Sequence, residues 1–202
     1  ITYMGLVFWT VLRSITNNPQ TKGAFGEMIV TSMFTSKFFG EEERYLINDL
    51  YFADETGTHQ IDHVLIYHKG IFVIETKHIE GTVCGDLEHK DWMVINKGRQ
   101  YRLYSPVVQN ETHVKVINEF FDNKYKVFSI VVFTKENKPL NIGDPVVNFS
   151  ELKNYIINYP SDENLSSEVM QDIYLKLNDY KKNCTIKKEE YVDVLHDDKH
   201  NK

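Results

Sequence analysis

The run from Val127 to Phe133 (Val-Phe-Ser-Ile-Val-Val-Phe) constrains the fold most, because it is almost continuously apolar. This pattern is typical of a central strand that is covered on both faces, since a strand with one face in water alternates polar and apolar residues. The chain has 202 residues, of which 42% are apolar. That is enough for one domain with a sizeable core, so we expect a sheet with helices packed on it.

The segments around this strand predict the other elements. Helical spacing and flanking signals predict helices at 23–39, 106–121, 151–159 and 163–180. Runs rich in β-formers predict strands at 45–52, 61–67, 71–77, 92–95 and 100–104, with short ones at 82–84 and 146–149. Short loops that contain Gly70 and Gly98 indicate two hairpins. The order predicts an α/β or α+β fold with a central mixed sheet flanked by helices.

We divide the chain into four parts. These are an N-terminal apolar helix or anchor stub (1–20), the main domain (21–150), C-terminal helices packed on it (151–182) and a polar tail (183–202). The segment 1–12 carries no charge, but it is shorter than the ~20 residues that cross a bilayer. A packed helix is therefore favoured, and a membrane tether stays open if the apolar run continues upstream. Two cysteines favour a reducing compartment, so we predict a cytoplasmic location.

The net charge of −6 argues against binding to nucleic acid through general basicity. An acidic chain can still act on phosphates if its carboxylates hold a metal ion. Strand alternation places Glu75 and Lys77 on the face of Ile71 and Val73. The hairpin register places Asp62 opposite the stretch from Glu75 to Lys77, on the face of Val64 and Ile66.

Two adjacent carboxylates repel each other, and a hard cation such as Mg²⁺ resolves this. Lys77 would then polarise a water beside a phosphate. The plainer interpretation is a surface Glu-Lys pair with an Asp nearby. A third carboxylate, Glu27, falls on the apolar stripe of the helix predicted at 23–39, although a Glu in the first turn also favours the helix dipole. Gly23 and Gly26 would let this helix approach the sheet closely.

The second hairpin mixes cations with rings. Lys97, Arg99 and Arg102 suit phosphates, and Trp92, Tyr101 and Tyr104 suit bases. The alternative is a solvated hairpin with core rings. Six histidines lie between positions 59 and 113, but no zinc-ligand spacing accompanies them.

Several of these segments together resemble a known family, the nuclease-related (NERD) domain. The matching motifs are Gly23-Ala24-Phe25-Gly26-Glu27, Gln60-Ile61-Asp62-His63, Gly70-Ile71-Phe72-Val73-Ile74-Glu75-Thr76-Lys77, Gly81, Gly85, Trp92 and Ser105-Pro106-Val107-Val108-Gln109-Asn110. They span about half of the chain. NERD domains are grouped with the PD-(D/E)XK nuclease superfamily, which implies a restriction-endonuclease-like αβββαβ core. The superfamily's Pro before the aspartate is Ile61 here.

The resemblance implies a catalytic site. Glu27, Asp62 and Glu75 would be metal ligands, with the carbonyl of Thr76 as an extra ligand. Lys77 would be the catalytic lysine, and Gln109 on the next helix would face the site.

From this we expect a Mg²⁺- or Mn²⁺-dependent endonuclease that acts on DNA. The alternative is a non-catalytic nucleic-acid-binding or scaffold module that keeps the nuclease fold. A homodimer and partner proteins of a defence or repair system are left open, as is membrane contact through the N-terminus.

Overall fold

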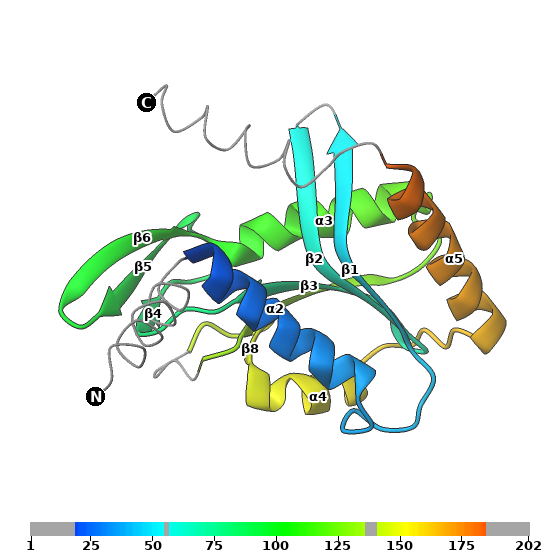
Figure 1. Ribbon diagram of the computed structural model, residues 1–202, viewed down its shortest axis with the longest axis horizontal. Helices are drawn as coiled ribbons and strands as arrows, with labels where there is room; N and C mark the ends of the chain where they lie inside the picture. Colours follow the sequence, from blue (N-terminus) through cyan, green and yellow to red (C-terminus); the bar gives the residue numbers. More distant parts are fainter. Residues whose placement is uncertain (1–18, 55–56, 136–140, 185–202) are drawn as a thin grey trace, which may run out of the picture. The chain divides into compact units, whose positions relative to one another are not determined.

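The computed structural model describes residues 19–54, 57–135 and 141–184, in which one helix, six strands, a second helix, two strands and two helices follow one another (Figure 1). The helices are α2 (Pro19–Thr35), α3 (Pro106–Phe120), α4 (Phe149–Ile157) and α5 (Ser167–Asn183). The strands are β1 (Tyr45–Asp54), β2 (Gly57–Tyr67), β3 (Gly70–Lys77), β4 (Thr82–Cys84), β5 (Asp91–Asn96), β6 (Arg99–Tyr104), β7 (Val127–Phe133) and β8 (Val146–Asn148). Every strand predicted from the sequence is present.

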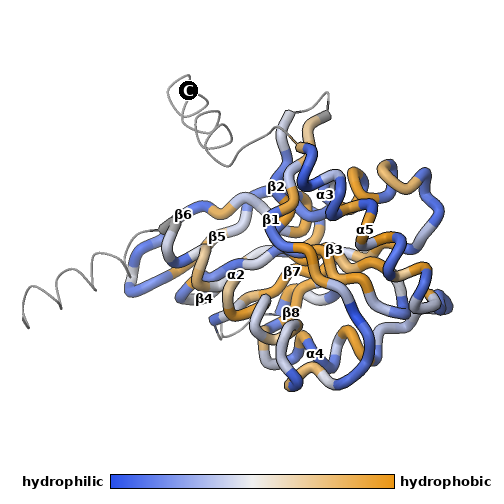
Figure 2. The backbone as a smooth tube through the Cα atoms, turned by 45° about the vertical axis from the view of Figure 1, so that its right-hand side comes forward, coloured by the Kyte–Doolittle hydropathy of each residue, from blue (hydrophilic) through white to orange (hydrophobic). Residues whose placement is uncertain are grey.

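The strands form two sheets. One has five strands in the order β1-β2-β3-β7-β8, and the other has three in the order β4-β5-β6. The β1–β2 and β2–β3 pairs are antiparallel and the β7–β8 pair is parallel, so the larger sheet is mixed. The prediction of a mixed central sheet with helices on it is therefore confirmed. Figure 2 shows apolar residues concentrated on β3 and β7, as the run from Val127 to Phe133 predicts.

The β2–β3 hairpin closes through a two-residue loop, with Tyr67 paired to Gly70. Gly70 has a φ of +131°, which an L side chain rarely adopts. A Cβ at this position would also lie 2.8 Å from the carbonyl oxygen of Lys126. The backbone N–H of Ile71 donates to that same oxygen at 3.0 Å. Glycine therefore lets the start of β3 approach the residue that precedes β7.

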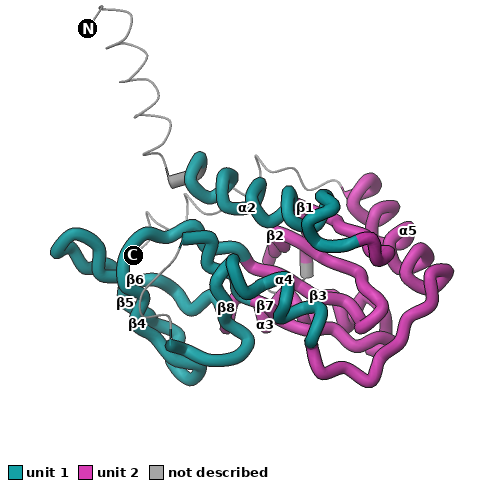
Figure 3. The backbone as a smooth tube through the Cα atoms, turned by 90° about the horizontal axis from the view of Figure 1, so that it is seen from below, with its two compact units in different colours: residues 1–40, 76–106, 131–158 teal, residues 41–75, 107–130, 159–202 magenta. Residues whose placement is uncertain are grey.

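The chain divides into two compact units (Figure 3). Unit 1 contains residues 1–40, 76–106 and 131–158, and unit 2 contains residues 41–75, 107–130 and 159–202. One boundary falls within β3, between Glu75 and Thr76, and another within β7, between Ile130 and Val131.

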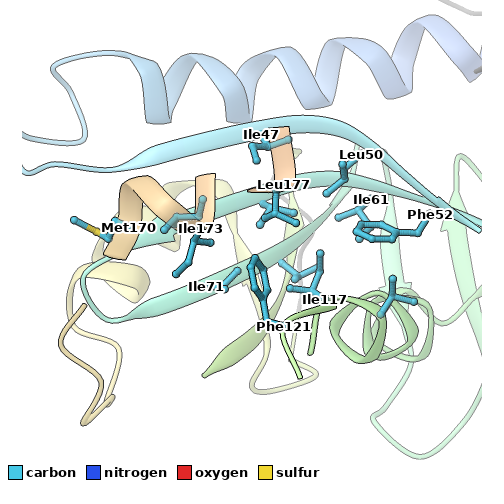
Figure 4. Close-up of a cluster of buried hydrophobic side chains, with 14 of the residues drawn as sticks. Ile47, Leu50, Phe52, Ile61, Ile71, Ile117, Phe121, Met170, Ile173 and Leu177 are labelled. Carbon is cyan, nitrogen blue, oxygen red and sulfur yellow. The ribbon is translucent and has the colours of Figure 1, made fainter. Parts of the chain in front are cut away.

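The core of unit 2 lies between its strands and the helices α3 and α5 (Figure 4). Ile173 and Leu177 of α5 and Ile117 of α3 pack with Ile47 of β1 and Ile71 of β3. Ser166 caps the N-terminus of α5, because its side chain accepts a hydrogen bond from the backbone N–H of Val169. This cap explains why the helix starts at Ser167 rather than at the predicted residue 163.

The remaining boundary predictions fall partly outside the described residues. The segment 1–12 lies outside them, as does most of the predicted tail. Within the described ranges, no helix combines the length and hydropathy needed to cross a membrane. The helix α2 begins at Pro19, before the predicted start, and ends at Thr35, where a turn through Ser36 to Gly40 follows.

Candidate active site

Glu75 is a buried carboxylate near the end of β3. Only 2% of its surface is exposed, and Ile71 and Val73, which precede it on the same face, belong to the core cluster of unit 2. Across from this face, His113 of α3 places Nδ1 3.6 Å from Glu75 Oε2. His113 is only 3% exposed. The predicted face of Glu75 is thus the one that α3 covers.

One amide side chain fixes α3 against the sheet. Asn110 is fully buried, and its Nδ2 donates to the carbonyl oxygens of Val73 (2.9 Å) and Ile130 (3.1 Å) and to the hydroxyl of Ser129 (2.8 Å). Val73 lies two residues before Glu75, and Asn110 lies three residues before His113. This link therefore fixes the position of α3 along β3, so that His113 lies beside Glu75.

Asp62 lies at the end of the β2–β3 ladder. The last pair of the ladder is His63 with Ile74, so the same register continued by one position would set Asp62 across from Glu75. This register agrees with the one predicted from the hairpin, which places Asp62 opposite the stretch from Glu75 to Lys77. Asp62 is half-buried.

The predicted alternation of β2 does not continue through Asp62. Ile61 joins the same core cluster as Val64 and Ile66, and on β1 both Ile47 and Leu50 join it. The neighbouring Asp49 has a φ of +48°, and the β1–β2 ladder has no pair between Asn48–His63 and Leu50–Ile61. Both strands change face at this level. The pairs on both sides of this level have the same register, so no residue is inserted in either strand. The placement of Asp62 on the face of Val64 and Ile66 stays a prediction.

Thr76 and Lys77 end β3 and belong to unit 1, together with Glu27 on α2. Within this unit, α2 approaches the end of β3 at Gly26, where a Cβ would lie 2.8 Å from that of His78. The backbone N–H of Thr134 donates to the carbonyl oxygen of Lys77 at 3.0 Å. Glu27 and Lys77 are both half-buried. Their membership of one site with Asp62 and Glu75 stays a prediction.

Gln109 is half-buried on α3, one turn before His113. The ring of His59 on β2 lies 6.2 Å from that of His113, edge to face. His63 is buried elsewhere on β2, where burial lowers its pKa from 6.5 to about 4. Its Nδ1 lies 2.8 Å from Asn48 Oδ1, which suits the predicted role of an ordinary strand residue. In the part of the chain that the structure describes, no three His, Cys, Asp or Glu side chains gather as a metal-binding group.

The second hairpin consists of β5 and β6, with Asn96 paired to Arg99 at its tip. Arg102 binds Asp91 across the two strands at 2.5 Å, and Lys97 lies 3.9 Å from Glu80. Tyr101 and Tyr104 are 45% and 50% exposed.

Trp92, in contrast, is a core residue. Its ring lies under Gly85, and its Nε1 donates to the carbonyl oxygen of Asp86 at 2.9 Å. The core-ring interpretation therefore holds for Trp92 alone among the three rings.

Sequence reasoning missed His113 and the role of Asn110. Both lie on one face of α3, three residues apart, and Gln109 precedes His113 by four. The signal in the sequence was the helical spacing of these three polar residues, because the rest of the face that α3 turns toward the sheet is apolar.

Three comparisons with known proteins bear on this arrangement. The family model described as nuclease-related domain (NERD) matches residues 22–134. An uncharacterized protein of Bacillus anthracis is 29% identical over 161 residues, which cover 77% of this chain and 75% of that protein. No solved structure matches the chain. The matched range includes every residue predicted for the site and for the basic hairpin.

Proposed function

Because the chain belongs to the nuclease-related domain (NERD) family, we propose that it is a metal-dependent nuclease that hydrolyses phosphodiester bonds in DNA. The observation that supports this most is the carboxylate at the end of β3. Glu75 is buried beside α3, and Asp62 comes one position beyond the last pair of the same hairpin. A buried carboxylate is costly unless it is paired or bound to a metal, so residues of this kind at the end of a ladder suit a cation site.

The donors available here fit a hard divalent cation. Asp62 and Glu75 supply carboxylate oxygens, and the backbone of Thr76 supplies a carbonyl oxygen, which are the ligands that Mg²⁺ prefers. In our proposal these groups and Glu27 hold Mg²⁺ or Mn²⁺. When bound, such an ion lowers the pKa of a coordinated water and offsets charge on the phosphate oxygens.

The other residues would orient the reactants. The ammonium of Lys77, two residues after Glu75 on the same strand, would donate hydrogen bonds to the attacking water and to a phosphate oxygen. The amide of Gln109 can donate and accept, so it would hold the water in line with the scissile bond. Lys97, Arg99 and Arg102 would contact phosphates away from the cut.

Incubation with supercoiled plasmid, linear duplex, single strands and RNA tests the proposal. Each substrate is tested with Mg²⁺, with Mn²⁺ and with chelator. We expect cleavage of DNA that depends on the metal, and a loss of at least about 100-fold in rate for Asp62→Ala and Lys77→Ala. Matched controls are Glu119→Gln and Lys115→Ala, which alter an exposed ion pair on α3. These should cleave like the wild type.

A non-catalytic binding or scaffold module would give a different pattern. It would bind nucleic acid equally well with and without Mg²⁺, and Asp62→Ala would change nothing. Full cleavage by both Asp62→Ala and Lys77→Ala would also refute the proposed site. Homodimer formation, partner proteins and a cytoplasmic location stay predictions.

A further inference from the structure

Glu75 requires a partner because its carboxylate lies almost entirely out of water. Its Oε2 is a buried atom, as is the Nδ1 of His113 that faces it. At 3.6 Å the contact is longer than an ordinary hydrogen bond, and catalytic contacts of this kind often tighten only when the site is filled. We propose that His113 is a positioning residue that holds the carboxylate of Glu75 in the orientation needed to bind the cation. This inference rests on the proposed function.

The position of His113 is itself fixed. Asn110 ties α3 to Val73 of β3, and one helical turn later His113 reaches Glu75. Ile117, four residues further along α3, is fully buried in the core of unit 2. The backbone of His113 is therefore fixed on both sides along its own helix, and its imidazole is buried where it faces Glu75.

Contact with His113 and coordination of a cation are compatible, because an ionised carboxylate has two oxygens and about four lone-pair sites. Groups that contact a metal ligand from behind orient it, and their loss typically lowers metal affinity or activity about 10–100-fold. His113 has the same relation to Glu75. In this role it contacts Glu75 and would touch neither the substrate nor the cation, so its effect on the reaction would pass through the carboxylate.

Two substitutions separate positioning from packing. His113→Leu keeps a similar volume but removes the polar contact. His113→Asn keeps an N–H donor near the place of Nδ1. A third variant, Ile117→Val, perturbs the core on the same helix without touching Glu75.

Calorimetric titration with Mg²⁺ and Mn²⁺ gives the main readout, together with kcat and KM on the cleaved substrate. We expect His113→Leu to bind both cations about 10–100-fold more weakly, with a matching fall in kcat and an unchanged KM for DNA. His113→Asn should recover most of this loss. Ile117→Val should lower the unfolding midpoint and leave cation affinity at the wild-type value. If His113→Leu binds Mg²⁺ as tightly as the wild type, or loses no more Mg²⁺ affinity than Ile117→Val does, the inference is wrong.

A double-mutant cycle distinguishes this failure from failure of the proposed function. Glu75→Gln and His113→Leu are made singly and together, and urea unfolding is measured without metal. Non-additive changes in the free energy of unfolding support a direct Glu75–His113 coupling, whereas additive changes overturn the inference even if the protein is an active nuclease. If the wild type binds no divalent cation and cleaves nothing, the proposed function fails. The role of His113 toward the cation then fails with it, whatever the cycle shows.

Discussion

Two glycines on α2 allow a matched test of how closely this helix approaches the end of β3. A Cβ at Gly26 would lie 2.8 Å from His78 Cβ, 3.2 Å from Thr134 Oγ1 and 3.3 Å from Thr76 Cγ2. Among the residues that the structure describes, a Cβ at Gly23 would meet only Glu27 Oε1, at an ordinary 3.9 Å. Both positions lie within the same helix, so alanine gains about 1 kcal/mol of helix propensity at either one.

Alanine at these two positions should therefore change the free energy of unfolding in opposite directions. His78 Cβ is the first atom of its side chain and cannot rotate away, so Gly26→Ala must displace α2. Overpacking of this kind costs about 1–3 kcal/mol, and after the propensity gain we expect a net loss of up to about 2 kcal/mol. Gly23→Ala should gain about 1 kcal/mol. For a chain of this size these values correspond to a fall in Tm of at most about 4–8 °C for Gly26→Ala and a rise of about 2–4 °C for Gly23→Ala.

Thermal unfolding followed by circular dichroism, with chelator present, measures both shifts under the same conditions. Equal Tm changes for the two variants would refute the close approach at Gly26. Gly26→Ala should also lose cleavage activity, because Thr76 and His78 flank Lys77.

Three further predictions concern the rest of the molecule. Asn110→Ala should destabilise the fold by about 2–4 kcal/mol in urea unfolding, since it removes hydrogen bonds to two carbonyl oxygens and one hydroxyl, and a destabilisation under about 1 kcal/mol would contradict this. Because the pKa of His63 is about 4 when folded and 6.5 when unfolded, its neutral form stabilises the protein above pH 6.5, and this stability is lost as the pH falls toward 4. At pH 5 the loss of stability is about 2 kcal/mol, so His63→Gln should show a smaller change in Tm between pH 7 and pH 5 than the wild type does. An equal change in Tm for the two proteins would contradict this role of His63. Replacing Lys97, Arg99 and Arg102 by Ala should weaken binding to duplex DNA. The slope of log affinity against log salt concentration should fall by about 1 for each phosphate that the hairpin no longer neutralises. An unchanged slope would show that the hairpin does not contact the DNA.

Local patterns were sufficient for much of the fold. The apolar run of β7 and the short loop between Tyr67 and Gly70 depend on residues close in sequence, and they predicted the mixed sheet and the level of Asp62 relative to Glu75. Pro106 at the start of α3 is equally local.

The features that escaped prediction depend on contacts between distant segments or on local distortion. The change of face near Asp62 accompanies a positive φ at Asp49, which the alternation rule does not anticipate. The contact of His113 with Glu75 joins residues from different elements and follows from where Asn110 fixes α3. The burial of Trp92 agrees with the core-ring interpretation of the hairpin, but the close packing of its ring against Gly85 was not predicted. The partner of each of these residues could not be derived from spacing along one segment.

Anomalous diffraction from crystals soaked with Mn²⁺ tests the central claim most directly. We predict one or two manganese peaks within about 2.0–2.5 Å of carboxylate oxygens of Asp62 and Glu75 and of the Thr76 carbonyl oxygen. The same peaks should be absent from Asp62→Ala crystals. Manganese bound elsewhere, with Asp62 and Glu75 contacting no ion in a protein that still cleaves DNA, would contradict the account.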